Sequence, residues 1–183
     1  MYFGEIKKFD IADGPGVRVS LFVSGCTHRC KGCFNPRTWD FTYGSEYTRS
    51  TMEDIIKALE PDYIDGLTLL GGEPMEPVNQ RELLSLVKKA KSLYPGKTIW
   101  CYTGYTLETE LQSDSRARCE CTDELLSYID VLVDGEFIEE QKNISLRFRG
   151  SANQRLIDMK KTLEAGETVL WTDDPCYEKH EFI

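Results

Sequence analysis

The sequence lacks any long apolar segment. No run of apolar residues approaches the roughly 18 that a membrane-spanning helix needs. The N-terminal segment MYFGEIKKFD also lacks the apolar stretch that marks a secretory signal peptide. From these two absences we expect a cytoplasmic protein with no membrane partner.

An excess of basic residues is absent as well. The 22 Lys and Arg residues are outnumbered by 31 Asp and Glu residues, which gives a formal net charge of −9 at pH 7. A protein that binds duplex nucleic acid gains affinity by neutralising phosphates, so this balance argues against a nucleic-acid partner. The 183 residues are enough for one domain with a hydrophobic core.

A disulfide framework of the secreted kind is missing too. Such frameworks use an even number of spread cysteines, whereas this chain has seven, of which three lie in the segment CTHRCKGC. These three are Cys26, Cys30 and Cys33. In a reducing cytosol, so tight a cluster favours metal binding over disulfide formation.

A fourth cysteine close to this cluster is also lacking. Structural zinc takes four protein ligands, and the remaining cysteines offer only the C-x-C pair Cys119 and Cys121, which is not a typical zinc knuckle. The C-x3-C-x2-C spacing instead resembles the segments that hold iron–sulfur cubes. A cube has four irons, so three thiolates leave one iron open to a substrate. A non-catalytic metal module, either an electron carrier or a zinc-stabilised binding domain, is the alternative.

Apolar periodicity predicts alternating strands and helices. Alternation predicts strands at 17–24 and 144–148, and buried apolar runs predict strands at 66–72, 97–104 and 130–135. Helical spacing predicts helices at 51–59, after a capping box of Ser50 and Glu53, at 79–94 and at 153–163. This order of elements predicts βαβ units in a mostly parallel α/β sheet.

Each predicted strand ends in a polar turn that contains glycine. The turns read SGCTHRC, GGEP, TGY, DGEF and RGS. Parallel sheets and barrels build their sites at the carboxyl ends of the strands, where these turns meet. We therefore expect the three cysteines to share one cavity with Glu73, Asp134 and Ser151.

Together these motifs resemble a known family. Cys26-x-x-x-Cys30-x-x-Cys33 is the signature of radical S-adenosylmethionine (SAM) enzymes. With DGPGVRVSLFVSGC, GCFNPRTWD, GGEP, IWCYTGY, DVLVDGEF and RGSANQ in order, the chain is similar to the proteins that activate anaerobic ribonucleoside-triphosphate reductase, a branch of the glycyl-radical-enzyme activases. The resemblance runs from Asp10 to Asn153. It does not cover residues 106–124 or the region after Leu163.

The resemblance implies a fold and a reaction. The fold would be an incomplete (β/α) barrel with helices outside, or alternatively an open α/β sheet. Residues 1–163 would form the radical SAM activase domain, and 164–183 a C-terminal extension with a small strand at TVLWT and a flexible acidic end. The enzyme would be an oxidoreductase that cleaves SAM reductively at a [4Fe–4S] cluster and generates a glycyl radical on the large subunit of the reductase. Its electron donor would be a protein such as flavodoxin or ferredoxin. The alternative is a radical SAM enzyme with a small-molecule substrate, similar to 7-carboxy-7-deazaguanine synthase.

The resemblance also implies a set of site residues. Cys26, Cys30 and Cys33 would ligate three irons, and SAM would bind the fourth, with no catalytic side chain beyond the cluster and SAM. The glycines of GGEP would let the backbone approach SAM closely, and Glu73 would accept a hydrogen bond from its ammonium group. The implied SAM contacts are Gly32, Cys33, Phe34, Gly71, Gly72, Glu73, Thr103, Asp134 and Ser151.

Other conspicuous residues have simpler interpretations. We expect His28 to be an exposed loop residue, even though it lies between two of the cysteines. The three tryptophans are predicted to pack in the interior rather than to contact a ligand. Arg149 faces either the carboxylate of SAM or water, and the sequence leaves both open.

Overall fold

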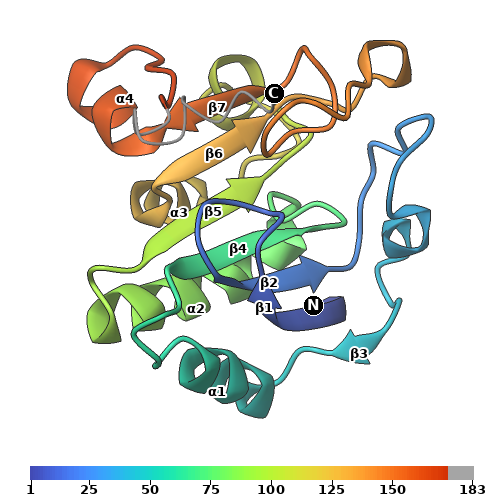
Figure 1. The fold of residues 1–183 in the computed structure, drawn as a ribbon. Helices are drawn as coiled ribbons and strands as arrows, with labels where there is room; N and C mark the ends of the chain where they lie inside the picture. Colours follow the sequence, from blue (N-terminus) through green and yellow to red (C-terminus); the bar gives the residue numbers. More distant parts are fainter. Residues whose placement is uncertain (173–183) are drawn as a thin grey trace, which may run out of the picture.

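Seven strands form one sheet in the computed structural model, which describes residues 1–172 (Figure 1). The order across the sheet is β3-β1-β2-β4-β5-β6-β7, so β3 and β7 lie at its edges. The strands are β1 (Tyr2–Asp10), β2 (Arg18–Val23), β3 (Ser45–Glu46), β4 (Gly66–Gly71), β5 (Thr98–Tyr102), β6 (Val131–Asp134) and β7 (Arg155–Asp158). The α-helices are α1 (Arg49–Ala58), α2 (Pro77–Leu93), α3 (Thr122–Tyr128) and α4 (Met159–Ala165), and short helical turns occur at Pro36–Trp39, Leu107–Leu111 and Glu139–Gln141.

The prediction of a mostly parallel sheet is correct only for its centre. Strands β2, β4, β5 and β6 are parallel neighbours, joined by crossovers that carry α1, α2 and α3. Strands β1, β3 and β7 pair antiparallel, because β1 returns directly to β2 through a short loop and no α-helix separates β6 from β7. The described chain is therefore a mixed α/β protein with a seven-stranded sheet.

Several predicted elements need correction. Strand β1 was not expected, and the strand predicted at 144–148 is an irregular loop in which Ile144 is 92% exposed. The helix predicted at 153–163 begins only at Met159, because the preceding residues form the edge strand β7. Helix α1 is capped by Thr48 and Thr51 rather than by Ser50 and Glu53.

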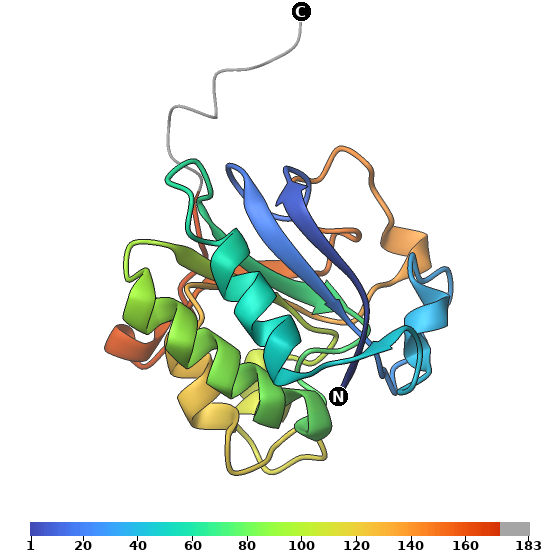
Figure 2. The same ribbon diagram turned by 90° about the horizontal axis from the view of Figure 1, so that it is seen from below.

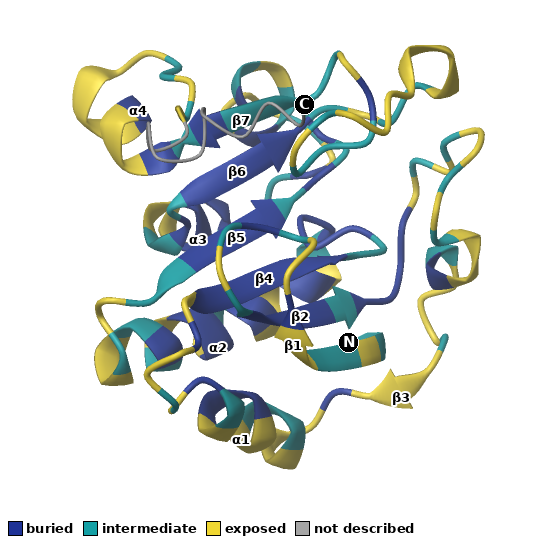
Figure 3. Cartoon of the chain, in the orientation of Figure 1, coloured by how far each residue is buried: buried dark blue, intermediate teal, exposed yellow. Residues whose placement is uncertain are grey.

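The two faces of the sheet follow from the alternation of side chains along each central strand. On one face Leu21, Leu69 and Leu132 pack with apolar residues of α1, α2 and α3 in the main core. Figure 2 shows these helices together on that face, and Figure 3 shows that the central strands are mostly buried whereas the helices also carry exposed residues. None of the helices in residues 1–172 is long and apolar enough to cross a membrane.

Arg18 is the charged exception inside the sheet. Its side chain is fully buried on the face opposite the helices, beside the ring of Trp100. Its Nε donates to Thr68 Oγ1 at 2.7 Å, and Nη2 donates to Leu67 O at 2.9 Å and Thr98 O at 3.0 Å. Burial lowers the pKa of Arg18 to about 10. One guanidinium therefore connects β2, β4 and the start of β5.

Arg18→Met should lower the free energy of unfolding by about 3 kcal/mol or more, because Leu67 O and Thr98 O lose a buried donor. Urea unfolding followed by circular dichroism measures the change. Arg49→Met is the control, because Arg49 lies on the exposed surface of α1 and its loss should cost less than about 0.5 kcal/mol. Equal effects of the two substitutions would contradict a structural role for the buried guanidinium.

Candidate functional site

The carboxyl ends of the central strands border a cavity of about 510 Å³. This volume lies within the range of small-molecule sites. Its floor is the sheet face opposite the helices, where Phe22, Leu70 and Tyr102 project. The cavity is lined by all three clustered cysteines, Cys26, Cys30 and Cys33, and by no other cysteine of residues 1–172. The structure agrees with the expectation that the cysteines share one cavity with Glu73, but Asp134 and Ser151 do not line this cavity.

The cysteines lie in the long loop that follows β2. Cys26 is buried, whereas Cys30 and Cys33 are partly exposed. Burial, together with the carboxylates of Glu73 and Glu136, raises the pKa of Cys26 to about 12 and that of Cys30 to about 11. Bare thiolates are therefore unfavourable here, and bound cations would supply the charge that stabilises them.

The three cysteine thiols form a donor set that fits an iron–sulfur cluster. Among the residues that the structure describes, no three side chains of His, Cys, Asp or Glu converge closely enough to hold one ion. The four-iron cube places each thiolate on a separate corner, so its ligands stand farther apart than those of tetrahedral zinc. The spread of the three thiols around one cavity is therefore compatible with a cube.

The GGEP turn after β4 forms one wall of the cavity. Gly71 has φ of +107°, and a Cβ on Gly72 would approach Gly25 O to 2.7 Å. Both glycines line the cavity, but the structure shows that they are also needed for close packing against β2 and the cysteine loop. Glu73 N donates to Gly25 O at 2.8 Å, which joins this turn to the cysteine loop.

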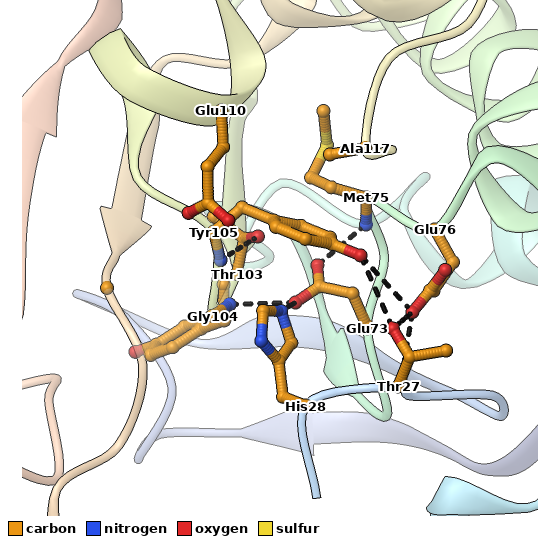
Figure 4. A network of polar contacts seen from close by, with 12 residues as sticks. Thr27, His28, Glu73, Met75, Glu76, Thr103, Gly104, Tyr105, Glu110 and Ala117 are labelled. Atoms are coloured by element: carbon orange, nitrogen blue, oxygen red, sulfur yellow. Dashed lines mark hydrogen bonds and ion pairs between the residues drawn. The ribbon is translucent and has the colours of Figure 1, made fainter. Parts of the chain in front are cut away.

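Glu73 is buried, and its carboxylate has several partners (Figure 4). Oε1 accepts from Met75 N at 2.8 Å, and Oε2 accepts from Gly104 N at 2.7 Å. His28 Nε2 lies 3.1 Å from Oε2, close enough for an ion pair but without hydrogen-bond alignment. A carboxylate has about four acceptor positions, so Glu73 retains capacity for one further donor from the cavity.

The expectation that His28 is an exposed loop residue is wrong. Its side chain is only 7% exposed, and its ring lies 4.3 Å from that of Tyr105, centroid to centroid. Burial opposes protonation, but the Glu73 carboxylate outweighs it and raises the pKa of His28. Local sequence pattern does not indicate this contact, because the two loops that meet here are far apart in the chain.

The other expected SAM contacts divide into two groups. Phe34 and Thr103 line the cavity with Cys33 and the GGEP turn. Gly32, Asp134 and Ser151 do not line it. Gly32 is exposed. Asp134 is buried behind the wall, where it accepts from Arg155 and from Leu107 N at 2.9 Å, and Ser151 Oγ accepts from Ile138 N at 3.2 Å. Asp134 and Ser151 therefore support the wall instead of facing the cavity.

Several residues that line the cavity were not among the expected SAM contacts. Arg149, which the sequence left open between cofactor and water, lies in the wall, with Nη1 donating to Gln154 O at 2.7 Å. Leu146 and Phe148 line the cavity, which explains why their alternating pattern imitated a strand. Trp100 is buried as expected, whereas Trp39 lines the cavity.

Asp10 and Asp13 form a carboxyl pair beside the floor of the cavity. Asp13 lines the cavity, and burial together with the Asp10 carboxylate raises its pKa to about 7. Asp10 is buried, and its Oδ1 accepts from Ala12 N at 3.0 Å, whereas Oδ2 has no donor among the described residues. A proton on Asp13 would make this residue a hydrogen-bond donor to the Asp10 carboxylate.

The remaining cysteines lie apart from this cavity. Cys101 is buried in the main core, on the helix side of β5. Cys119 and Cys121 precede α3 in the segment that the family resemblance did not cover, and the Cys119 thiol lies 3.5 Å from Gln80 Oε1. Cys176 and the acidic end of the chain lie outside the described residues.

Comparisons with known proteins agree with the cysteine geometry. Residues 12–157 match the family described as a 4Fe-4S single cluster domain. The chain is 47% identical over 156 residues to the anaerobic ribonucleoside-triphosphate reductase-activating protein of Vibrio cholerae, which is 84% of this chain and 96% of that protein. The proteins of that name from Enterobacteria phage T4 and Escherichia coli K12 are each 40% identical, over 85% and 84% of this chain and 93% and 96% of theirs.

The Asp10–Asp13 pair predicts a pH-dependent stability. Asp13 holds its proton more tightly in the folded chain, with a pKa of about 7, than the usual carboxyl does when unfolded. Its stabilising contribution is therefore complete below about pH 4 and is lost as the pH rises to about 7. Asp10 has a lowered pKa, so its contribution changes only at still lower pH.

Asp13→Asn keeps a donor for Asp10 at every pH and should remove this dependence. Relative to the wild type, the variant should gain on the order of 1 kcal/mol between pH 5 and pH 8, a figure reduced for the partial exposure of the carboxyl. Urea unfolding of both proteins at several pH values measures the difference. A difference that stays constant with pH would contradict the shared proton.

Proposed function

Because the chain belongs to the family of anaerobic ribonucleoside-triphosphate reductase-activating proteins, we propose that it activates such a reductase by generating a glycyl radical on its large subunit. The observation that carries this proposal is the placement of Cys26, Cys30 and Cys33 in one cavity with the GGEP turn. The 4Fe-4S family match over residues 12–157 supports the same assignment.

The three cysteines would hold three irons of a [4Fe–4S] cluster, and SAM would occupy the rest of the cavity. When bound, the cluster and SAM supply reductive cleavage of SAM to methionine and a 5′-deoxyadenosyl radical, which takes a hydrogen atom from a glycine of the reductase. The chain orients both groups and shields them from water. Phe34 and Phe137, whose ring centroids are 5.1 Å apart, provide apolar cover at the cavity.

The polar residues of the cavity wall would bind the charged groups of SAM. Glu73 would receive the ammonium group of SAM in its remaining acceptor position, and Thr103 lies beside it at the end of β5. Asp134 and Ser151 would act indirectly, by holding the loops that follow β6. Arg149, the first residue of the RGS turn, lines the cavity and would face the carboxylate of SAM.

The same proposal covers the type of fold, the bounds of the domain, the electron donor and the cell compartment. The sheet, with helices on one face and the cavity on the other, would correspond to the incomplete barrel of radical SAM enzymes. Residues 1–163 would form the activase domain, although Trp171 N already donates to Leu156 O of β7 at 2.9 Å. A donor such as flavodoxin or ferredoxin would reduce the cluster, and the reaction would take place in the cytoplasm.

Cys30→Ala should abolish normal iron and sulfide content and reduce SAM cleavage by at least about 1,000-fold, because the cluster loses one of three thiolate ligands. Cys121→Ser is the matched control, because Cys121 lies outside the cavity. Iron analysis and chromatography of 5′-deoxyadenosine after anaerobic reduction measure both quantities. Retained cleavage in Cys30→Ala would refute the ligand assignment.

The proposed reaction itself is tested by electron paramagnetic resonance. Reconstituted and reduced protein is mixed with SAM and the anaerobic reductase from the same source. A glycyl-radical doublet that requires SAM is the expected result. Formation of 5′-deoxyadenosine without a doublet would keep SAM cleavage but refute the reductase as substrate.

A further inference from the structure

The first turn of α2 holds the cysteine loop on both sides of Cys26. Before the cysteine, Ser24 O accepts a hydrogen bond of 3.0 Å from Asn79 Nδ2, and the same amide group donates to Glu73 O at 2.9 Å. After the cysteine, Thr27 is bound by the carboxylate of Glu76. Asn79 and Glu76 are both buried. Cys26 therefore lies between two attachment points on one helix terminus.

The Glu76 carboxylate is the stronger of these attachments (Figure 4). Its Oε1 accepts from Thr27 N at 2.9 Å and from Thr27 Oγ1 at 2.5 Å. Tyr105 Oη lies 3.4 Å from the same oxygen and 3.5 Å from Thr27 Oγ1. Hydrogen bonds to a charged acceptor are stronger than neutral ones, so this three-residue contact fixes the peptide after Cys26.

A purely helix-capping role does not explain Glu76. It is the N-cap residue of α2, yet its side chain makes no hydrogen bond to the helix. Pro77 occupies the first helical position and has no N–H to satisfy. The carboxylate is instead directed to the cysteine loop, although it is only 7% exposed and a buried charge needs strong partners.

The other two cysteines are held less firmly. Their turn is closed by its own hydrogen bond, from Cys33 N to Cys30 O at 3.2 Å. Lys31 of this turn pairs with Glu139 at 2.9 Å, but the lysine is 77% exposed and such pairs contribute little. Arg29 and Gly32, on either side of Cys30, both have positive φ.

We infer that Glu76, with Tyr105, is a positioning residue that fixes Thr27 and thereby holds Cys26 in place before any cluster is bound. Cys26 is then the preformed ligand, and the turn with Cys30 and Cys33 adjusts to it. The ordering of Thr27 stands on the contacts alone. Its consequence for the cluster rests on the proposed function.

Amide hydrogen exchange of the metal-free, full-length chain tests the ordering. The Thr27 amide should exchange at least about tenfold faster in Glu76→Ala, which removes the acceptor, and by an intermediate factor in Glu76→Gln, which keeps a weaker one. Thr27→Val removes only the hydroxyl donor at an exposed position, so it preserves the fold and should also accelerate exchange. Glu120→Ala is the control, because Glu120 pairs with Arg81 of α2 and does not contact the cysteine loop.

Iron release to a chelator from the reconstituted protein tests the consequence. The rate should rise in the same order, with Glu76→Ala faster than Glu76→Gln and Glu76→Gln faster than wild type, while Glu120→Ala matches wild type. Unchanged Thr27 exchange in both Glu76→Ala and Thr27→Val would overturn the inference. Faster exchange with unchanged iron release would overturn the role toward the cluster. A wild-type protein that takes up no iron would refute the proposed function, and the exchange comparison would still decide the ordering.

Discussion

The carboxylate of Glu73 is the contact on which the candidate site depends. It joins the GGEP turn, the TGY turn and the cysteine loop, which follow β4, β5 and β2. Burying a charge is costly unless donors surround it, so Glu73 is stable only where Met75 N, Gly104 N and His28 converge. The positions of the three turns and the burial of Glu73 depend on each other, because the turns must keep these positions for the carboxylate to remain buried. The contacts that hold this wall of the cavity in place are thus made within the protein itself.

The sheet makes this convergence possible by separating its two faces. Leucines of the central strands pack on the helices, and the alternate residues project into the cavity or against the loops above it. The second face tolerates a buried charge where acceptors surround it. Arg18 shows the principle most clearly, since it donates to backbone and hydroxyl oxygens of β4 and β5. Apolar packing fixes the helices, and hydrogen bonds fix the loops.

The sequence predicted the parts of this structure that depend on local pattern. Buried apolar runs identified β4, β5 and β6, and the turns after them correctly indicated where the cavity lies. It did not predict β1, whose charged and half-exposed residues lack a clean alternation. It misassigned 144–148, because a loop that covers a cavity can show the alternation of a strand. The burial of His28 and the pairing of Asp134 with Arg155 depend on contacts between distant segments, which periodicity cannot reveal.

The unequal spacing of the cysteines has a physical interpretation in these contacts. The longer gap, between Cys26 and Cys30, contains Thr27, which binds Glu76 at the start of α2, and His28, which lies against Glu73 of the GGEP turn. Side chains in this gap therefore turn toward α2 and the TGY turn, which leaves the thiols to face the cavity. The shorter gap contains exposed Lys31 and Gly32 with positive φ, which shape a tight turn without attaching it firmly. The loop is attached firmly at Cys26 and loosely at the turn that holds Cys30 and Cys33. Such a loop suits a set of ligands that must close around a cluster. The spacing of the cysteines therefore reflects how firmly each part of the loop is attached, as well as which residues would bind the cluster.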